Sequence, residues 1–236
     1  MGVLAGGVVE DGKMLARAAE RRKPWVVRLV AIVSATLVLS ARTLADVVPT
    51  DGMVISANTT FVPGTYYLPS GVSIGASGIA LDMNGATLVG TQFNNYGVTC
   101  IGRNNVTIRN GAVHGYYYGI RIENGAGIQI VNNDLSGNWL DPASLQAPPP
   151  FLNINVGPNL GDRTNLGGGL FMNNVSGATV SGNTASNQEN GLDLFYVTGS
   201  TISGNDASDN TGWGIHLYAA TDNTVSGNVA DRCFRT

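Results

Sequence analysis

Four residues in the second half of the chain could take part in acid–base or ionic chemistry, and each stands two or four places after a glycine. They are Arg121, Glu123, Asp193 and His216. A carboxylate can orient an imidazole so that it acts as a general base, and a guanidinium can hold a carboxylate with two parallel hydrogen bonds. This combination suits an acidic sugar, provided that the fold brings the four side chains to one face.

The glycines before these residues begin copies of one short segment. The copies read GVTCIGRNNVTIRNG from Gly97, GIRIENGAGIQIVNN from Gly119, GGLFMNNVSGATVSGN from Gly168, GLDLFYVTGSTISGN from Gly191 and GIHLYAATDNTVSGN from Gly214. Apolar residues alternate with polar ones after each glycine, which indicates strands. A unit of about 22 residues cannot bury its apolar side alone, so the sequence predicts an all-β, single-domain parallel β-helix of stacked coils.

Four of the five copies end in a turn that contains an asparagine 14 residues after Gly119, Gly169, Gly191 or Gly214. These turn residues are Asn133, Asn183, Asn205 and Asn228. If the coils stack at about 4.8 Å, their amides can hydrogen-bond along the axis, as stacked amides do in cross-β assemblies. We therefore expect an asparagine ladder on one side of the helix.

Stacking also aligns the outward positions of the first strand into two columns on one face. In axial order they are Thr99, Arg121, Phe171, Asp193 and His216, and Ile101, Glu123, Asn173, Phe195 and Tyr218, with Tyr118 and Trp213 at the edge. Aromatic rings can pack on the apolar faces of sugars. We expect Tyr118, Phe171, Asn173, Phe195, Trp213 and Tyr218 to bind substrate, and Arg121, Glu123, Asp193 and His216 to carry any catalysis. The alternative is that the rings stack on one another as cross-strand pairs and the charges are solvated.

The spacing along the axis limits the chemistry. Asp193 and His216 fall on neighbouring coils, about 4.8 Å apart, so the carboxylate can orient the imidazole. Glu123 and Asp193 lie two coils apart, roughly 12 Å between Cα atoms, which approaches the carboxylate separation of an inverting glycosidase but not that of a retaining one. An elimination with His216 or Arg121 acting on a uronate is an equally open alternative.

The first 45 residues have the pattern of a secretory signal. Basic residues precede the apolar run Leu29–Ala41, and Thr43-Leu44-Ala45 provides small residues for cleavage before Asp46. The residues before Met14 resemble a mispredicted start. The run is shorter than the ~20 residues of a spanning helix, so we expect a secreted or periplasmic protein, with an uncleaved membrane anchor as the alternative.

Without this leader the chain holds six arginines, no lysine and 13 acidic residues. An acidic chain is a poor partner for nucleic acid or an anionic membrane surface. Soft metal ligands are scattered, so we expect no metal site and no cofactor; calcium is conceivable, but nothing in the sequence supports it. Cys100 and Cys233 are about four coils apart, too far for a disulfide. We expect a monomer whose partner is a polysaccharide or glycan.

The mature chain divides into a less regular cap at 46–77 and coils at 78–236, interrupted by a loop insertion at about 141–168. Insertions in solenoids form loops on one face, which is often the binding face. The chain ends as a coil finishes, without a polar terminal unit, so we expect that it is truncated after Thr236.

Several segments resemble a known family. PGTYYLPSGVSI, LDMNGATLVG, GIRIENGAGIQIVNNDLSGN and GWGIHLYAATDNTVSGN are similar to right-handed parallel β-helix repeats of the pectin-lyase-like superfamily, particularly its NosD-like bacterial set, over about Val54–Cys233. The resemblance implies the right-handed fold. It leaves the activity open, because the superfamily contains lyases, hydrolases, epimerases and noncatalytic members.

No signature of one branch is present. The sequence lacks paired aspartates, a Gly-His-Gly turn and an Asp-Pro-His-Glu motif, because Asp141-Pro142 continues as Ala143-Ser144. The leading hypothesis is an exported carbohydrate-interacting β-helix, with lyase, hydrolase or epimerase activity on acidic polysaccharide as its enzymatic form. The alternative is a noncatalytic envelope or surface scaffold. A NosD-like factor for copper-site maturation is the third hypothesis.

Overall fold

The computed structural model describes residues 46–91, 94–138 and 167–233. The chain divides into two compact units, Met1–Arg42 and Thr43–Thr236, and every described residue belongs to the second. The predicted leader at 1–45 and residues 141–166 of the predicted insertion lie outside the described residues.

The described residues form three sheets in which every pair of strands is parallel. Sheet 1 contains β1 (Val54–Ile55), β4 (Val72–Ile74), β7 (Tyr96–Ile101), β10 (Tyr118–Ala126), β12 (Gly168–Ser176), β14 (Asn190–Thr198) and β16 (Ile215–Tyr218). Sheet 2 contains β2 (Thr59–Thr60), β5 (Ala80–Asp82), β8 (Thr107–Arg109), β11 (Gln129–Val131), β13 (Thr179–Ser181), β15 (Thr201–Ser203) and β17 (Thr224–Ser226). Sheet 3 contains β3 (Thr65–Tyr67), β6 (Thr87–Val89) and β9 (Ala112–His114).

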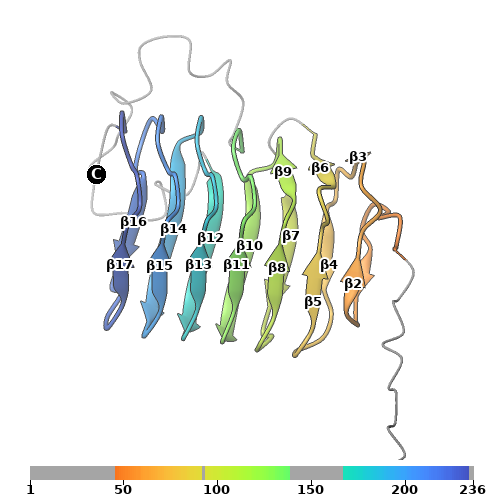
Figure 1. Cartoon of the computed structure of the whole chain (residues 1–236), viewed down its shortest axis with the longest axis horizontal. Helices are drawn as coiled ribbons and strands as arrows, with labels where there is room; N and C mark the ends of the chain where they lie inside the picture. Colours follow the sequence, from red (N-terminus) through yellow and green to blue (C-terminus); the bar gives the residue numbers. More distant parts are fainter. Residues whose placement is uncertain (1–45, 92–93, 139–166, 234–236) are drawn as a thin grey trace, which may run out of the picture. The chain divides into compact units, whose positions relative to one another are not determined.

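The chain passes from sheet 1 to sheet 2 and sheet 3 in each coil. It then returns to sheet 1, where the new strand pairs with the sheet 1 strand of the preceding coil (Figure 1). Beyond β9, sheet 3 continues as single bridges through Asp134, Thr184, Asp206 and Val229. The prediction of an all-β parallel β-helix with coils of about 22 residues is therefore confirmed. No helix among the described residues is long and apolar enough to cross a membrane.

The core is the interior of the coils, where the alternation of the strands directs their apolar side chains. Ile120 and Ile122 of β10 and Leu192 and Leu194 of β14 are completely buried. Small inward residues such as Ala207 are also completely buried. Cys100 lies in this core as a free thiol, and Cys233 is free as well, so the expected absence of a disulfide between them is confirmed.

The asparagine ladder is present. Asn183 Oδ1 accepts from both the backbone N–H and the side-chain amide of Asn133, at 3.0 and 3.1 Å, and Asn205 Oδ1 accepts from Asn183 in the same way. Asn228 completes the row by accepting from Asn205. Each side-chain amide also donates to a carbonyl of the preceding coil, such as Asn183 Nδ2 to Ile130 O at 2.8 Å. The ladder fixes the coil register because it pairs buried backbone groups that the turns leave free.

The segment expected to act as a cap, 46–77, contributes β1 to β4, which occupy the first places in the three sheets. At the other end of the described stack, apolar side chains are partly uncovered. Val225 of β17 is 48% exposed, whereas Ile202, its neighbour in β15, is completely buried. Val225 thus occupies the inward position that is buried in the other coils, but no further described coil covers it.

Candidate functional site

The two outward columns of sheet 1 have the predicted register. Arg121, Phe171, Asp193 and His216 are aligned residue by residue across β10, β12, β14 and β16, and so are Glu123, Asn173, Phe195 and Tyr218. The first-column residues stand at the same offset in each coil, two places after Gly119, Gly169, Gly191 and Gly214, so the register holds although the segment between Gly119 and Gly169 is longer than the others. The fold thus brings all four candidate catalytic residues to one face.

Asp193 and His216 form a buried cluster with Tyr118. His216 Nδ1 lies 3.1 Å from Asp193 Oδ1, and Asp193 Oδ2 accepts from the Tyr118 hydroxyl at 2.6 Å and from Asn190 Nδ2 at 3.1 Å. Asp193 is only 1% exposed and His216 only 8%. With an ionised Asp193 accepting all three bonds, the tautomer of a neutral His216 that fits this geometry carries its proton on Nδ1 and leaves Nε2 as the basic nitrogen.

Tyr118 stays protonated in this cluster. Burial raises the pKa of its hydroxyl well above the usual value, and the Asp193 carboxylate raises that pKa further. A hydroxyl that cannot ionise is a permanent donor to Asp193. The tyrosine was expected to stack on substrate, but its ring is 1% exposed, so its observed contacts are with the protein.

Aromatic rings form a continuous row through the site. Tyr118 packs on Phe171 at 5.3 Å between ring centroids, Phe171 on Phe195 at 5.7 Å, and Phe195 on Tyr218 at 5.8 Å. The indole of Trp213 stacks on His216 at 5.0 Å with the ring planes 10° apart. Four of the six residues expected to bind sugar are thus ordered by cross-strand ring contacts of the kind that the alternative hypothesis required. Trp213 stacks within its own coil, and Asn173 lies between Glu123 and Phe195.

Arg121 and Glu123 occupy the other end of this row. Both Nε and Nη2 of Arg121 donate to Glu123 Oε1 at 2.7 Å, and the guanidinium lies 4.5 Å above the ring of Tyr96. These residues line a pocket of about 210 Å³ together with Tyr117, Tyr118 and Phe171. A cation held on an aromatic face keeps its remaining N–H donors in a fixed plane.

The two carboxylates that were considered as a pair hold different partners. Glu123 bonds Arg121, Asp193 bonds Tyr118 and His216, and β12 runs between their strands. The sequence reasoning missed Tyr96 and Asn190. Tyr96 stands two residues before the inward Val98, and it pairs with Tyr118 of the next coil. Aligning the coils by their glycines would therefore have placed Tyr96 beside Tyr118.

No group of three or more histidine, cysteine, aspartate or glutamate side chains within the described ranges could hold a metal ion. The expectation that no metal or cofactor is bound stays a prediction.

The arrangement agrees with the comparison to protein families. The family described as "Right handed beta helix region" matches residues 70–236. The chain belongs to this family. The match covers most of the described β-helix and establishes its right-handed winding, whereas membership of the NosD-like set stays a prediction.

Among solved structures, this β-helix is similar to the A-module of the mannuronan C-5 epimerase AlgE6 from Azotobacter vinelandii. The two are 18% identical with a TM-score of 0.39, and the match covers 77% of this chain and 54% of the module. The chain thus spans about half of that module, and the likeness concerns the fold and carries nothing about activity. A search of curated proteins found no match.

Proposed function

We propose that this right-handed β-helix is an exported protein that binds an acidic polysaccharide along the outer face of sheet 1. The observation that carries the proposal is the row of aromatic side chains that ends in the Arg121 pocket. Within the row Tyr118 and Phe195 are buried, but Phe171 and Tyr218, with Trp213 beside them, are partly exposed and can supply apolar faces for sugars. A guanidinium with unused N–H donors can pair with a uronate carboxylate. The export rests on the leader pattern, and the binding rests on the geometry of Arg121 and the aromatic row.

The proposed polymer lies along the helix axis, because the two chemical groups of the face are far apart. Arg121 and His216 are separated by β12 and β14, hence by three strand spacings, or roughly 14 Å. They cannot act on the same sugar residue. Arg121 would hold the carboxylate of one sugar, and the Asp193–His216 pair would meet another.

The enzymatic form of the proposal uses His216 as the base. With Nδ1 donating to Asp193, Nε2 can take the proton that lies next to a uronate carboxyl group. In an elimination, the electron pair of the broken C–H bond would form a C=C double bond as the neighbouring glycosidic oxygen leaves, and the His216 imidazolium or solvent would protonate that oxygen. In an epimerisation, solvent water would return a proton to the opposite face of the same carbon. Chemistry of a hydrolase would need a second carboxylate beside Asp193, and Glu123 is engaged with Arg121.

The test is a binding titration of the whole chain with oligogalacturonate and oligoalginate. Arg121→Gln should weaken binding by about tenfold or more, since a charge-assisted bidentate contact is lost. The matched control is Arg109→Gln. Arg109 also pairs with a carboxylate, that of Asp82 at 2.9 Å, but it lies on sheet 2. Absence of binding to either polymer, or equal losses in both variants, would contradict the proposal.

A noncatalytic scaffold is the second candidate, and the burial of Asp193 favours it. Both oxygens of this carboxylate are bonded within the protein. If the cluster only joins strands, Asp193→Asn and His216→Gln will leave any release of unsaturated uronate or new reducing ends unchanged. If His216 is a base, both variants will lose that activity while they still bind the polymer.

A further inference from the structure

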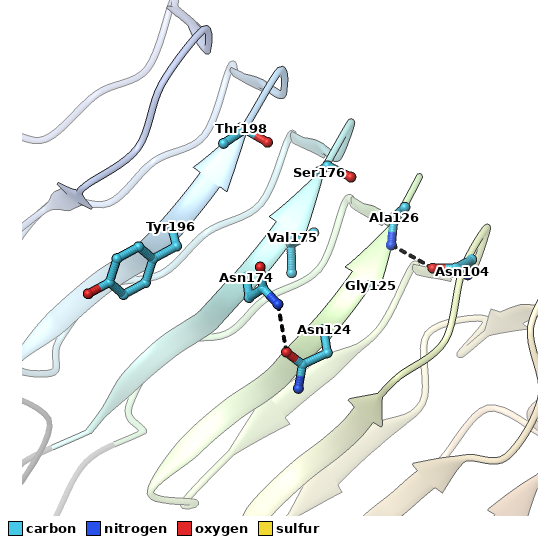
Figure 2. Close-up of a pocket in the computed structure, with 9 residues that line it drawn as sticks. All are labelled: Asn104, Asn124, Gly125, Ala126, Asn174, Val175, Ser176, Tyr196 and Thr198. Atoms are coloured by element: carbon cyan, nitrogen blue, oxygen red, sulfur yellow. Dashed lines mark hydrogen bonds between the residues drawn. The ribbon is translucent and has the colours of Figure 1, made fainter.

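A second pocket, of about 320 Å³, lies on sheet 1 beyond the aromatic row, at the carboxyl ends of β10, β12 and β14 (Figure 2). We call it the Tyr196 pocket. Its walls include the side chains of Asn124, Asn174, Tyr196 and Ser176, and none of its lining residues is charged. It is therefore chemically distinct from the pocket that holds Arg121 and Glu123.

A local change of backbone conformation within the strands creates this pocket. Asn124, Asn174 and Tyr196 each follow an outward position of the second column, and each has a left-handed backbone, with φ of 54°, 56° and 53°. Asparagine tolerates this conformation, whereas a bulky ring does so rarely. A tyrosine at such a position marks a site where a side chain is kept in spite of its backbone cost.

The ring of Tyr196 is presented to the solvent. It is 53% exposed, and it contacts Tyr218 at 5.9 Å with the ring planes at 90°. Figure 2 shows this ring on the same side of the sheet as the amides of Asn174 and Asn124. Exposed aromatic surface held at a fixed angle is a platform on which the apolar face of a sugar can lie.

The two amides supply complementary hydrogen-bonding groups. Asn174 Nδ2 donates to Asn124 Oδ1 at 2.8 Å, which orients both side chains. Among the described residues, neither Asn124 Nδ2 nor Asn174 Oδ1 has a hydrogen-bond partner, and Figure 2 shows these two atoms at opposite ends of the bonded amide pair. Two hydroxyl groups on different parts of one sugar, each of which both donates and accepts, match this donor and this acceptor.

We propose that the Tyr196 pocket binds a neutral sugar residue, with its ring on Tyr196 and two of its hydroxyls bonded to Asn124 and Asn174. A charged sugar is disfavoured because the pocket has no group to compensate its desolvation. The site extends the proposed function without depending on it. A glycan that carried both acidic and neutral residues would occupy the Arg121 pocket and the Tyr196 pocket together.

The experiment is saturation-transfer NMR of the full chain with methyl glycosides of glucose, galactose and mannose, and with methyl glucuronide as the charged probe. At least one neutral glycoside should bind. Tyr196→Asn should weaken its binding by about tenfold or more, as truncation of an aromatic anchor does. Asparagine accepts the left-handed backbone, so this variant should unfold at the same temperature as the unaltered chain or a higher one.

The matched control is Tyr67→Asn, which removes a tyrosine that is 63% exposed on β3 in sheet 3. It should not change binding of the neutral glycoside. Asn174→Gly, which permits the same backbone but removes the amide, should weaken binding as well. The proposal fails if no neutral glycoside binds, if binding survives in Tyr196→Asn, or if Tyr67→Asn is equally damaging. Binding of the glucuronide reports on the Arg121 pocket separately. Failure of binding at one pocket can therefore be distinguished from failure at the other.

Discussion

Asp193 is a charged residue on the outer face of a sheet, yet it is as buried as the core. A carboxylate in this setting persists only when its oxygens are fully bonded, because desolvation otherwise disfavours the ion. Tyr118, Asn190 and His216 provide these bonds from three different strands. The same contacts that could orient His216 as a base therefore also join β10, β14 and β16.

Replacing Asp193 by alanine should lower the free energy of unfolding by about 3 kcal/mol, because a buried hydroxyl, an amide and an imidazole lose their acceptor together. Urea denaturation measures this. Asp209→Ala is the control, since the Asp209–Arg232 pair is exposed and should contribute little. Equal stabilities of the two variants would show that the cluster does not hold the strands.

The two thiols should differ in reactivity. Burial raises the pKa of Cys100 to about 11, so at pH 8 its thiolate is scarce, and the side chain is fully covered. Cys233 is partly exposed. Iodoacetamide should therefore modify Cys233 in the folded protein and Cys100 only after denaturation. Peptide mapping checks this, and labelling of Cys100 in the folded state at a comparable rate would refute the packing around it.

At the scale of the coil, buried amide ladders set the register. The asparagine ladder through Asn183 joins equivalent turns of successive coils. A second ladder runs through Asn138, Gln188 and Asn210, and each of these side-chain oxygens accepts from a backbone N–H of the preceding coil. Such a row pairs groups that neither sheet satisfies. The coils therefore stack in one register only.

Asn183→Ala should lower the free energy of unfolding by about 3 kcal/mol, because the Asn133 N–H and the Ile130 carbonyl lose their partner in a buried place. Asn228→Ala should cost less. Asn228 is only half-buried, so water can replace its bonds to Asn205 and Ile202. Thermal unfolding of both variants gives the comparison, and an equal or larger loss for Asn228 would contradict this account of the ladder.

At the scale of the molecule, the β-helix is a one-dimensional stack in which the strands of each described coil pair only with those of the neighbouring coils. Burial of an inward side chain thus depends on the coils on both sides. Ile202 has described coils on both sides and is completely buried, whereas Val225 at the same register is 48% exposed. Stability should accordingly be unequal along the axis.

Ile202→Ala should cost about 3 kcal/mol, since it opens a cavity in a packed interior, and Val225→Ala should cost less than about 1 kcal/mol. Denaturant unfolding of the two variants tests this. The positions share a register, so any difference reports their place in the stack. A loss at Val225 as large as that at Ile202 would mean that this end is covered.

The sequence alone determined the coils, the columns and the asparagine ladder. The repeated glycine-led segment and its two-residue alternation fix these, because positions at equal offsets from the glycine come to lie side by side when the segments stack. What only the tertiary structure decided is which partners the outward side chains take. The spacing already placed Asp193 beside His216. That Tyr118 closes this cluster and that Arg121 turns to Glu123 and Tyr96 depend on side-chain directions and on neighbours in space, which the order of residues along the chain does not specify.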